Sequence, residues 1–217
     1  GIQPGDRVAM ACSNNRHFVE AYLAIIGIGA VAVPVNPTSP PPELQRELGA
    51  VEPVALLLEP FGLGILEALD RGALGSLRHV ILTEPPATGS GELASLVEIA
   101  ASVGDGERDA VPVLDVDPDT TAVMMFTSGT AGSSRPAMLS HRNLLANLAQ
   151  SRTSPVHVES SDVVYGVLPL FHIFGLNVML GLTLAQGASL VLVQRFDPST
   201  AADSIRDRGV TVLPGAP

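Results

Sequence analysis

Residues 7–35, RVAMACSNNRHFVEAYLAIIGIGAVAVPV, decide the fold class. Residues 8–12 are apolar at every position, as expected of a strand that is buried on both faces. Residues 15–28 follow with apolar side chains at helical spacing, and residues 30–35 return to a β-rich apolar run. A buried strand, a helix and a second buried strand predict two parallel strands with a helix packed on them.

The same alternation continues along the chain. Further strands are expected at residues 54–59, 79–83, 122–126, 137–139, 163–167, 188–193 and 210–213. A short helix is expected to begin at residues 41–43. Further helices are expected near 65–69, at 141–150, near 174–185 and near 198–208, with loops at 84–91 and 104–119. Ser140 is the expected cap of the helix at 141–150. The predicted fold is α/β, with layered parallel sheets flanked by helices.

The composition excludes several classes of protein. Of 217 residues, 46% are hydrophobic and only 16% are charged, which excludes a disordered chain. The net charge of −10 argues against a nucleic-acid partner. Cys12 is the single cysteine, so an internal disulfide and a zinc cluster are excluded, and no metal site is predicted within this chain.

Two apolar stretches, residues 21–35 and 172–193, have enough hydrophobic character to raise the question of a membrane span. The first is short and contains Pro34, and the second contains Asn177, Gln186 and several glycines. Both are better interpreted as a buried helix followed by a buried strand. With no signal peptide visible, we expect a cytoplasmic protein without a transmembrane segment, and leave a peripheral membrane association open.

Residues 124–141, MMFTSGTAGSSRPAMLSH, carry the clearest chemical signal. The first six residues after the strand, 127–132, contain three hydroxyls and two glycines, and one cation, Arg135, follows. Small residues let backbone N–H groups line a concavity, hydroxyls add donors and the cation offsets negative charge, which suits a polyphosphate. The Walker pattern G-x-x-x-x-G-K-[ST] is absent. On composition alone, a polar surface connection is the alternative interpretation.

This segment closely resembles the phosphate-binding signature of the adenylate-forming superfamily, which includes acyl-CoA synthetases, amino-acid adenylation domains and luciferases. That signature runs approximately T-S-G-T-T-G-x-P-K-G-V, with Ser/Thr-His a few residues later. The positions in register are Thr127, Ser128, Gly129, Thr130, Gly132, Ser140 and His141. The resemblance implies that Thr127, Ser128, Thr130 and the backbone of Gly129 and Gly132 hold the β and γ phosphates of ATP, while Arg135 neutralises them.

Other parts of the chain match the same superfamily in order and spacing. PLFHIFGL at residues 169–176 resembles its next core segment, which implies that His172 lies beside the carboxylate being activated. A histidine in an apolar stretch is otherwise more often a satisfied core residue. The opening strand–helix–strand and the terminal VTVLPGAP also match, and the latter implies that Gly215 borders the acyl pocket.

The phosphate loop departs from the family pattern at residues 134–136. Ser-Arg-Pro stands where the family has Pro-Lys-Gly. Arg135 keeps the charge, whereas Pro136 fixes its own φ, removes an N–H donor and restricts Arg135. Ala131 also replaces a hydroxyl. These changes put the geometry of nucleotide binding in doubt.

The resemblance implies an acid–thiol ligase as the full-length parent. It would use ATP to convert a carboxylic acid into an acyl-adenylate and then transfer the acyl group to coenzyme A. A fatty acid is the expected substrate. Residues 1–217 would form part of the large N-terminal domain, without the C-terminal domain and without most ligands of Mg²⁺. We expect the piece alone to be inactive and to self-associate. Two alternatives remain: an amino-acid or aryl-acid adenylation domain that feeds a carrier protein, and a catalytically silent homologue.

Overall fold

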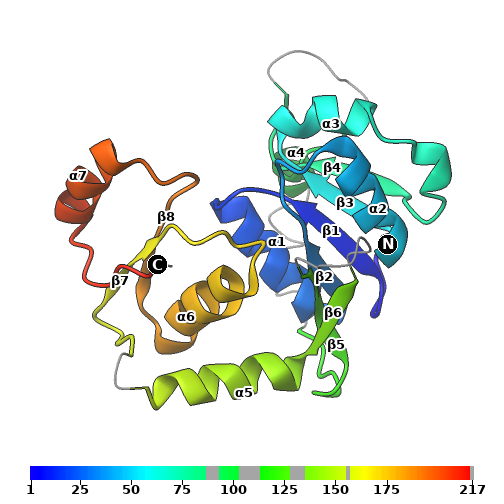
Figure 1. Ribbon diagram of the computed structural model, residues 1–217. Coiled ribbons are helices and arrows are strands. Elements are labelled where there is room, and N and C mark those ends of the chain that lie inside the picture. Colours follow the sequence, from blue (N-terminus) through cyan, green and yellow to red (C-terminus); the bar gives the residue numbers. More distant parts are fainter. Residues whose placement is uncertain (87–92, 103–112, 128–134, 155–156, 216–217) are drawn as a thin grey trace.

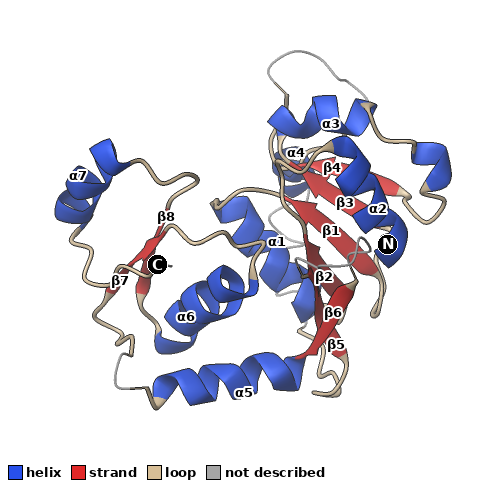
Figure 2. Ribbon diagram, in the orientation of Figure 1, coloured by secondary structure: helices blue, strands red, loops and turns tan. Residues whose placement is uncertain are grey.

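The computed structural model describes residues 1–86, 93–102, 113–127, 135–154 and 157–215. Over these residues the chain forms two β-sheets surrounded by helices, so the predicted α/β fold is confirmed (Figure 1, Figure 2). The phosphate-loop residues 128–134 lie outside the described part of the chain. No helix among the described residues combines the length and apolar character needed to cross a membrane.

The larger sheet has the strand order β4-β3-β1-β2-β5-β6. Its strands are β1 (Arg7–Ala11), β2 (Val31–Pro34), β3 (Ala55–Leu58), β4 (His79–Leu82), β5 (Thr121–Phe126) and β6 (Pro136–Ser140). β1 to β5 are parallel, as predicted. β6 runs antiparallel to β5, so the expectation of purely parallel pairing is wrong for this pair. The connection through residues 127–135 is too short for the crossover that parallel strands require.

Helices cover both faces of this sheet because its strands bury side chains on both sides. Val8 and Met10 of β1 belong to the core shared with α1 (Arg16–Gly27), whereas Ala9 and Ala11 face the core under the helices α2 (Pro41–Val51) and α3 (Leu63–Glu67). Three shorter elements complete this half: η1 (Pro60–Gly62), η2 (Arg71–Ala73) and α4 (Leu96–Ser102). The sequence did not predict α4.

The smaller sheet pairs β7 (Val163–Gly166) in parallel with β8 (Ser189–Leu192). The strand expected at residues 210–213 is reduced to a single bridge between Val212 and Val164. The surrounding helices are α5 (His141–Arg152), η4 (Phe174–Gly181), α6 (Leu182–Gln186) and α7 (Pro198–Arg208). The helix predicted at 174–185 therefore consists of a π-helix, η4, followed by α6. Ser140 caps α5 in a capping box with Asn143, which confirms the predicted cap.

One hydrophobic core joins the two sheets. Val8 and Phe18 from the larger sheet and its helix share this core with Leu170 and Leu176, which lie just before and within η4. The segment between β7 and η4 is thus held against the larger sheet.

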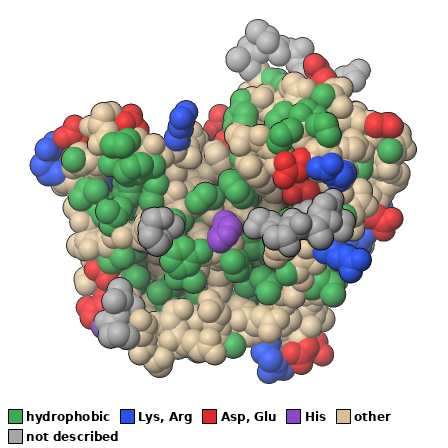
Figure 3. Space-filling view, in the orientation of Figure 1, with side chains coloured by type: hydrophobic (Ala, Val, Ile, Leu, Met, Phe, Trp, Pro, Cys, Tyr) green, Lys and Arg blue, Asp and Glu red, His purple; other side chains and the backbone are tan. Residues whose placement is uncertain are grey.

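On the surface, hydrophobic side chains gather over broad areas of the face seen in Figure 3, and most charged side chains lie toward its rim.

Candidate functional site

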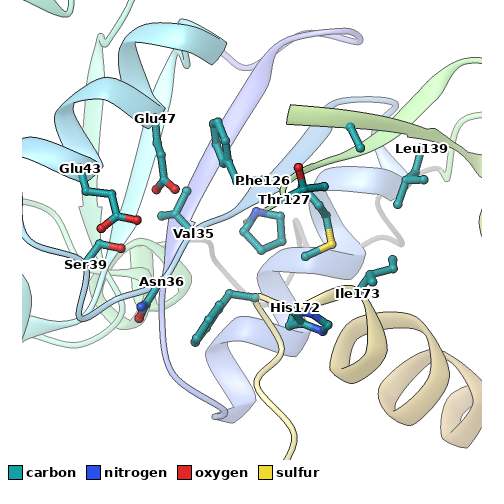
Figure 4. Close-up of a pocket in the computed structure, with 14 residues that line it drawn as sticks. Val35, Asn36, Ser39, Glu43, Glu47, Phe126, Thr127, Leu139, His172 and Ile173 are labelled. Carbon is teal, nitrogen blue, oxygen red and sulfur yellow. The ribbon is translucent and has the colours of Figure 1, made fainter. Parts of the chain in front are cut away.

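A cavity of about 440 Å³ opens where the carboxyl ends of β2 and β5 meet the start of η4 (Figure 4). Ligands of open parallel sheets bind at the carboxyl ends of strands, so its position is the expected one. Its walls come from the segment after β2, from α2, from the β5–β6 hairpin and from the turn before η4. The lining residues are Pro34, Val35, Asn36, Ser39, Glu43, Glu47, Met125, Phe126, Thr127, Ala137, Leu139, Phe171, His172 and Ile173.

Two residues that the sequence nominated, Thr127 and His172, line this one cavity although 45 positions separate them along the chain. Thr127 follows directly after β5, so the buried strand delivers the first residue of the loop to the cavity wall. Ser128, Gly129, Thr130 and Gly132 lie outside the described residues. The structure thus unites the first residue of the predicted phosphate loop with the predicted carboxylate-side histidine.

Arg135 is exposed and precedes Pro136, the first residue of β6. Pro136 pairs with Phe126, the last residue of β5. The hairpin therefore brings Arg135 back to the carboxyl end of β5, where Thr127 follows the strand. A proline at the first position of a strand at the sheet edge is tolerated because the N–H it lacks is not needed there. Arg135 itself is not part of the cavity wall.

His172 is held by hydrogen bonds on both sides of its backbone. Its N–H donates to the Pro169 carbonyl at 3.1 Å, and its own carbonyl accepts from the Leu176 N–H at 2.8 Å. The ring atom Nδ1 accepts from the N–H of Phe174 at 3.3 Å. We therefore assign the proton of the neutral imidazole to Nε2, which leaves an N–H donor for a ligand.

An acidic wall made by Glu43 and Glu47 of α2 lies across the cavity from His172 (Figure 4). Glu47 is 8% exposed, and among the described residues its Oε2 has no hydrogen-bond partner. Burial, and then the charge of Glu43, raise the pKa of Glu47 to about 7, while Arg46 acts in the opposite direction. Sequence reasoning missed this wall, because a glutamate in an amphipathic helix carries no local sign that its side chain turns inward.

A second cleft of about 500 Å³ adjoins the first and shares Asn36 and Phe171 with it. Gln194 and the cation Arg195 line this cleft, so its charge is opposite to that of the acidic wall. The last described residue, Gly215, is exposed and lines neither space. Within the described ranges, no group of three or more His, Cys, Asp or Glu side chains is placed to hold a metal ion.

The chain is similar to known proteins over nearly all of its length. The 4-coumarate–CoA ligase 5 of Oryza sativa subsp. japonica is 31% identical over 223 residues, covering 100% of this chain and 39% of the relative. The long-chain-fatty-acid–CoA ligase of Thermus thermophilus is 33% identical over 219 residues, covering 100% and 38%. Among solved structures, ATP-bound MatB from Rhodopseudomonas palustris has a TM-score of 0.81 at 30% identity, covering 98% of this chain and 39% of that one.

The chain thus spans about 40% of the length of these relatives. A family model described as AMP-binding enzyme matches residues 1–217. The superfamily that the sequence resembled is therefore confirmed: the chain belongs to the AMP-binding enzyme family of adenylate-forming proteins.

Proposed function

We propose that the full-length protein containing this chain is an acid–thiol ligase that activates a carboxylic acid with ATP and transfers the acyl group to coenzyme A. The observation that carries the proposal is the shared cavity of Thr127 and His172 at the carboxyl ends of β2 and β5. The family match and the CoA ligases among the relatives support the same reaction class. Residues 1–217 would then form part of the large nucleotide-binding domain.

The first step forms an acyl-adenylate. A carboxylate oxygen of the acid attacks the α-phosphorus of ATP, the bond to the β-phosphate oxygen breaks, and pyrophosphate leaves. His172 would donate its Nε2–H to the other carboxylate oxygen, which holds the acid in line with the phosphorus. Such a hydrogen bond orients the nucleophile without consuming a proton.

The phosphates require donors and positive charge. Thr127, Ser128, Thr130 and the backbone of Gly129 and Gly132 would hold the β and γ phosphates, and Arg135 would neutralise them. Phosphoryl chemistry on ATP also uses Mg²⁺. The described residues provide no cluster of metal-ligating side chains, so they do not form a complete magnesium site, and its ligands would belong largely to the rest of the protein.

The second step transfers the acyl group. The sulfur of coenzyme A attacks the acyl carbon, AMP leaves with the electrons of the acyl–oxygen bond, and the thiol proton goes to solvent or to a base. We propose a fatty acid as the substrate, with Gly215 bordering its pocket. The relatives named above are ligases of 4-coumarate and of long-chain fatty acids, which supports an organic carboxylic acid as the substrate.

We also propose a cytoplasmic location.

Two further functions remain to be distinguished: an adenylation domain that feeds a carrier protein, and a silent homologue. Pyrophosphate exchange with ATP should be measured on the full-length protein across fatty, aryl and amino acids, with thioester formation on coenzyme A as a second readout. Exchange with fatty acids and a CoA thioester product are expected. Exchange without the CoA product would indicate a carrier-fed domain, and absence of exchange with every acid would indicate a silent homologue.

The role of His172 can be tested in the same assay. His172→Ala should reduce exchange by roughly tenfold to a hundredfold, since a misplaced reactant loses much of its orientational advantage. His157→Ala is a matched control, because His157 is half exposed and contacts Glu159 at 3.2 Å on the surface. Equal activity of the two variants would exclude His172 from the site.

A further inference from the structure

The side chain of Asn14 joins the larger sheet to the segment that leads into His172. Asn14 follows β1 and is 5% exposed. Its Nδ2 donates to the carbonyls of Gly166 at 2.9 Å and Leu168 at 2.8 Å, and its Oδ1 accepts from the N–H of Leu170 at 2.9 Å. Both N–H donors and the oxygen are therefore used, and all three partners are backbone groups of one segment.

That segment, residues 166–170, connects β7 to the turn that presents His172. The N–H of His172 bonds to the Pro169 carbonyl, between two residues that Asn14 holds. Gly175 allows the start of η4 to pack on the same turn: a Cβ there would lie 2.7 Å from the carbonyl carbon of Pro169 and closer still to its oxygen. The position of the imidazole thus depends on a turn that is fixed from both sides.

The other side of Asn14 is anchored by its neighbours in the sequence. Ser13 donates to the Glu59 carboxylate through its backbone N–H at 2.5 Å and its hydroxyl at 3.0 Å. Asn15 donates to Glu59 at 2.8 Å and also caps α1 by accepting from the Phe18 N–H at 2.9 Å. The backbone around Asn14 is therefore fixed by contacts with β1, β3 and α1, so the Asn14 side chain can hold the segment at residues 166–170 in a constant position.

We propose that Asn14 is a positioning residue that acts through His172. It docks the segment at residues 166–170, and with it the turn that presents His172, on the carboxyl end of the larger sheet, so that the imidazole lies in the cavity that Thr127 lines. The inference rests on the proposed function, because a positioned histidine matters only if His172 serves the reaction. Asn14→Asp has the shape of the native side chain but loses both N–H donors, and its carboxylate would face the carbonyl oxygens of Gly166 and Leu168.

A double-mutant cycle in the full-length protein tests the proposal. Asn14→Asp should lower kcat for pyrophosphate exchange by roughly tenfold or more, because small displacements of a reacting group are costly, while the KM for ATP stays within about twofold. In a His172→Ala background the same substitution should change kcat by less than about twofold. Equal effects of Asn14→Asp in the two backgrounds would overturn the proposal.

The matched control is Asn177→Asp. Asn177 is as buried as Asn14, and its Nδ2 donates to the Leu144 carbonyl at 3.2 Å and to Asn147 at 2.8 Å, so it ties η4 to α5. The Asn177→Asp variant should be less stable than the native protein but should keep its kcat. Asn14→Ser is the milder variant should Asn14→Asp not fold, since it removes the bonds without burying a charge, and it should give the same kinetic pattern.

A spectroscopic readout separates this proposal from the proposed function. The ¹⁵N signals of the His172 ring report which ring nitrogen carries the proton. Asn14→Asp or Asn14→Ser should shift these signals toward a mixture of tautomers, and Asn177→Asp should not. Signals unchanged in the Asn14 variants would overturn the positioning role in any case, whereas inactivity of the native protein on every acid would count against the proposed function alone.

Discussion

Replacing Glu47 by glutamine should stabilise the protein at neutral and alkaline pH but not at acidic pH. The carboxylate of Glu47 is buried, and its Oε2 lacks a partner among the described residues. Its pKa rises from 4.5 to about 7 on folding, chiefly through burial. Below about pH 4.5 the group is protonated in both the folded and unfolded chains, so it has no net effect. As the pH rises to about 7 the unfolded chain ionises first, stability falls, and above pH 7 the loss is constant.

The size of this effect follows from the pKa shift. At about 1.4 kcal/mol per pKa unit, the shift corresponds to at most about 3 kcal/mol. The group borders a solvent-accessible cavity, which screens part of the charge, so about 1–2 kcal/mol is a reasonable expectation. For a domain of this size each kcal/mol moves Tm by roughly 2–4 °C.

Thermal unfolding at pH 8 and at pH 4.5 is the assay. Glu47→Gln should raise Tm by about 2–8 °C at pH 8 and by only about 1 °C at pH 4.5, where half of the unfolded groups are still protonated. Glu67→Gln is the matched control, because Glu67 is exposed on α3 and should give no gain at either pH. An equal gain at both pH values, or none at pH 8, would refute the claim that a buried negative charge destabilises this wall.

Three other predictions concern Arg135, Gly175 and the apolar surface of the isolated chain. Arg135→Ala in the full-length protein should weaken ATP use roughly tenfold to a hundredfold, the value of about 1.5–3 kcal/mol for a charge-assisted contact, and Arg135→Lys should not. Unchanged exchange in the alanine variant would mean that Arg135 does not contact phosphate. Gly175→Ala should lower the unfolding free energy by about 1–3 kcal/mol, because the new Cβ would overlap Pro169. Gly64→Ala is the control, because the space around Gly64 is open and no such loss is expected. Similar losses in the two variants would contradict the overlap at Gly175. The isolated chain should self-associate in light scattering through exposed apolar side chains such as Phe174 at 39% and Leu213 at 58%; a monomer would disprove it.

Much of the fold could be predicted because buried parallel strands are apolar on both faces. β1 to β5 lie within one or two residues of their predicted positions, and the ends of α7 match the predicted residues 198–208. The direction of β6 could not be predicted from its residues, since pairing direction depends on the connection and not on the strand. The π-helical start of η4 likewise follows from packing, which no local pattern encodes.

The residues of the candidate cavity could be predicted only where they belong to a motif of consecutive residues. Thr127 and His172 each belong to a recognisable segment, and both line the cavity. Glu47 and Asn14 belong to no such segment. The inward direction of Glu47 depends on the packing of α2, and Asn14 is a polar residue after a strand, which by itself indicates only a turn. Their surroundings come from segments that the chain brings together only in three dimensions.

The distance along the chain between Asn14 and its partners has a consequence for the order of folding. These contacts close loops of 152 to 156 residues, and the entropy lost on closing a loop grows with its length. Local β–α–β units meet no such barrier and form early. The segment at residues 166–170 should therefore dock in one of the last steps of folding, after the local β–α–β units of the larger sheet have formed. A newly made chain would then form the sheet around β1 to β4 before His172 is in position, and native-state hydrogen exchange should find the amide of Leu170 among the earlier ones to open.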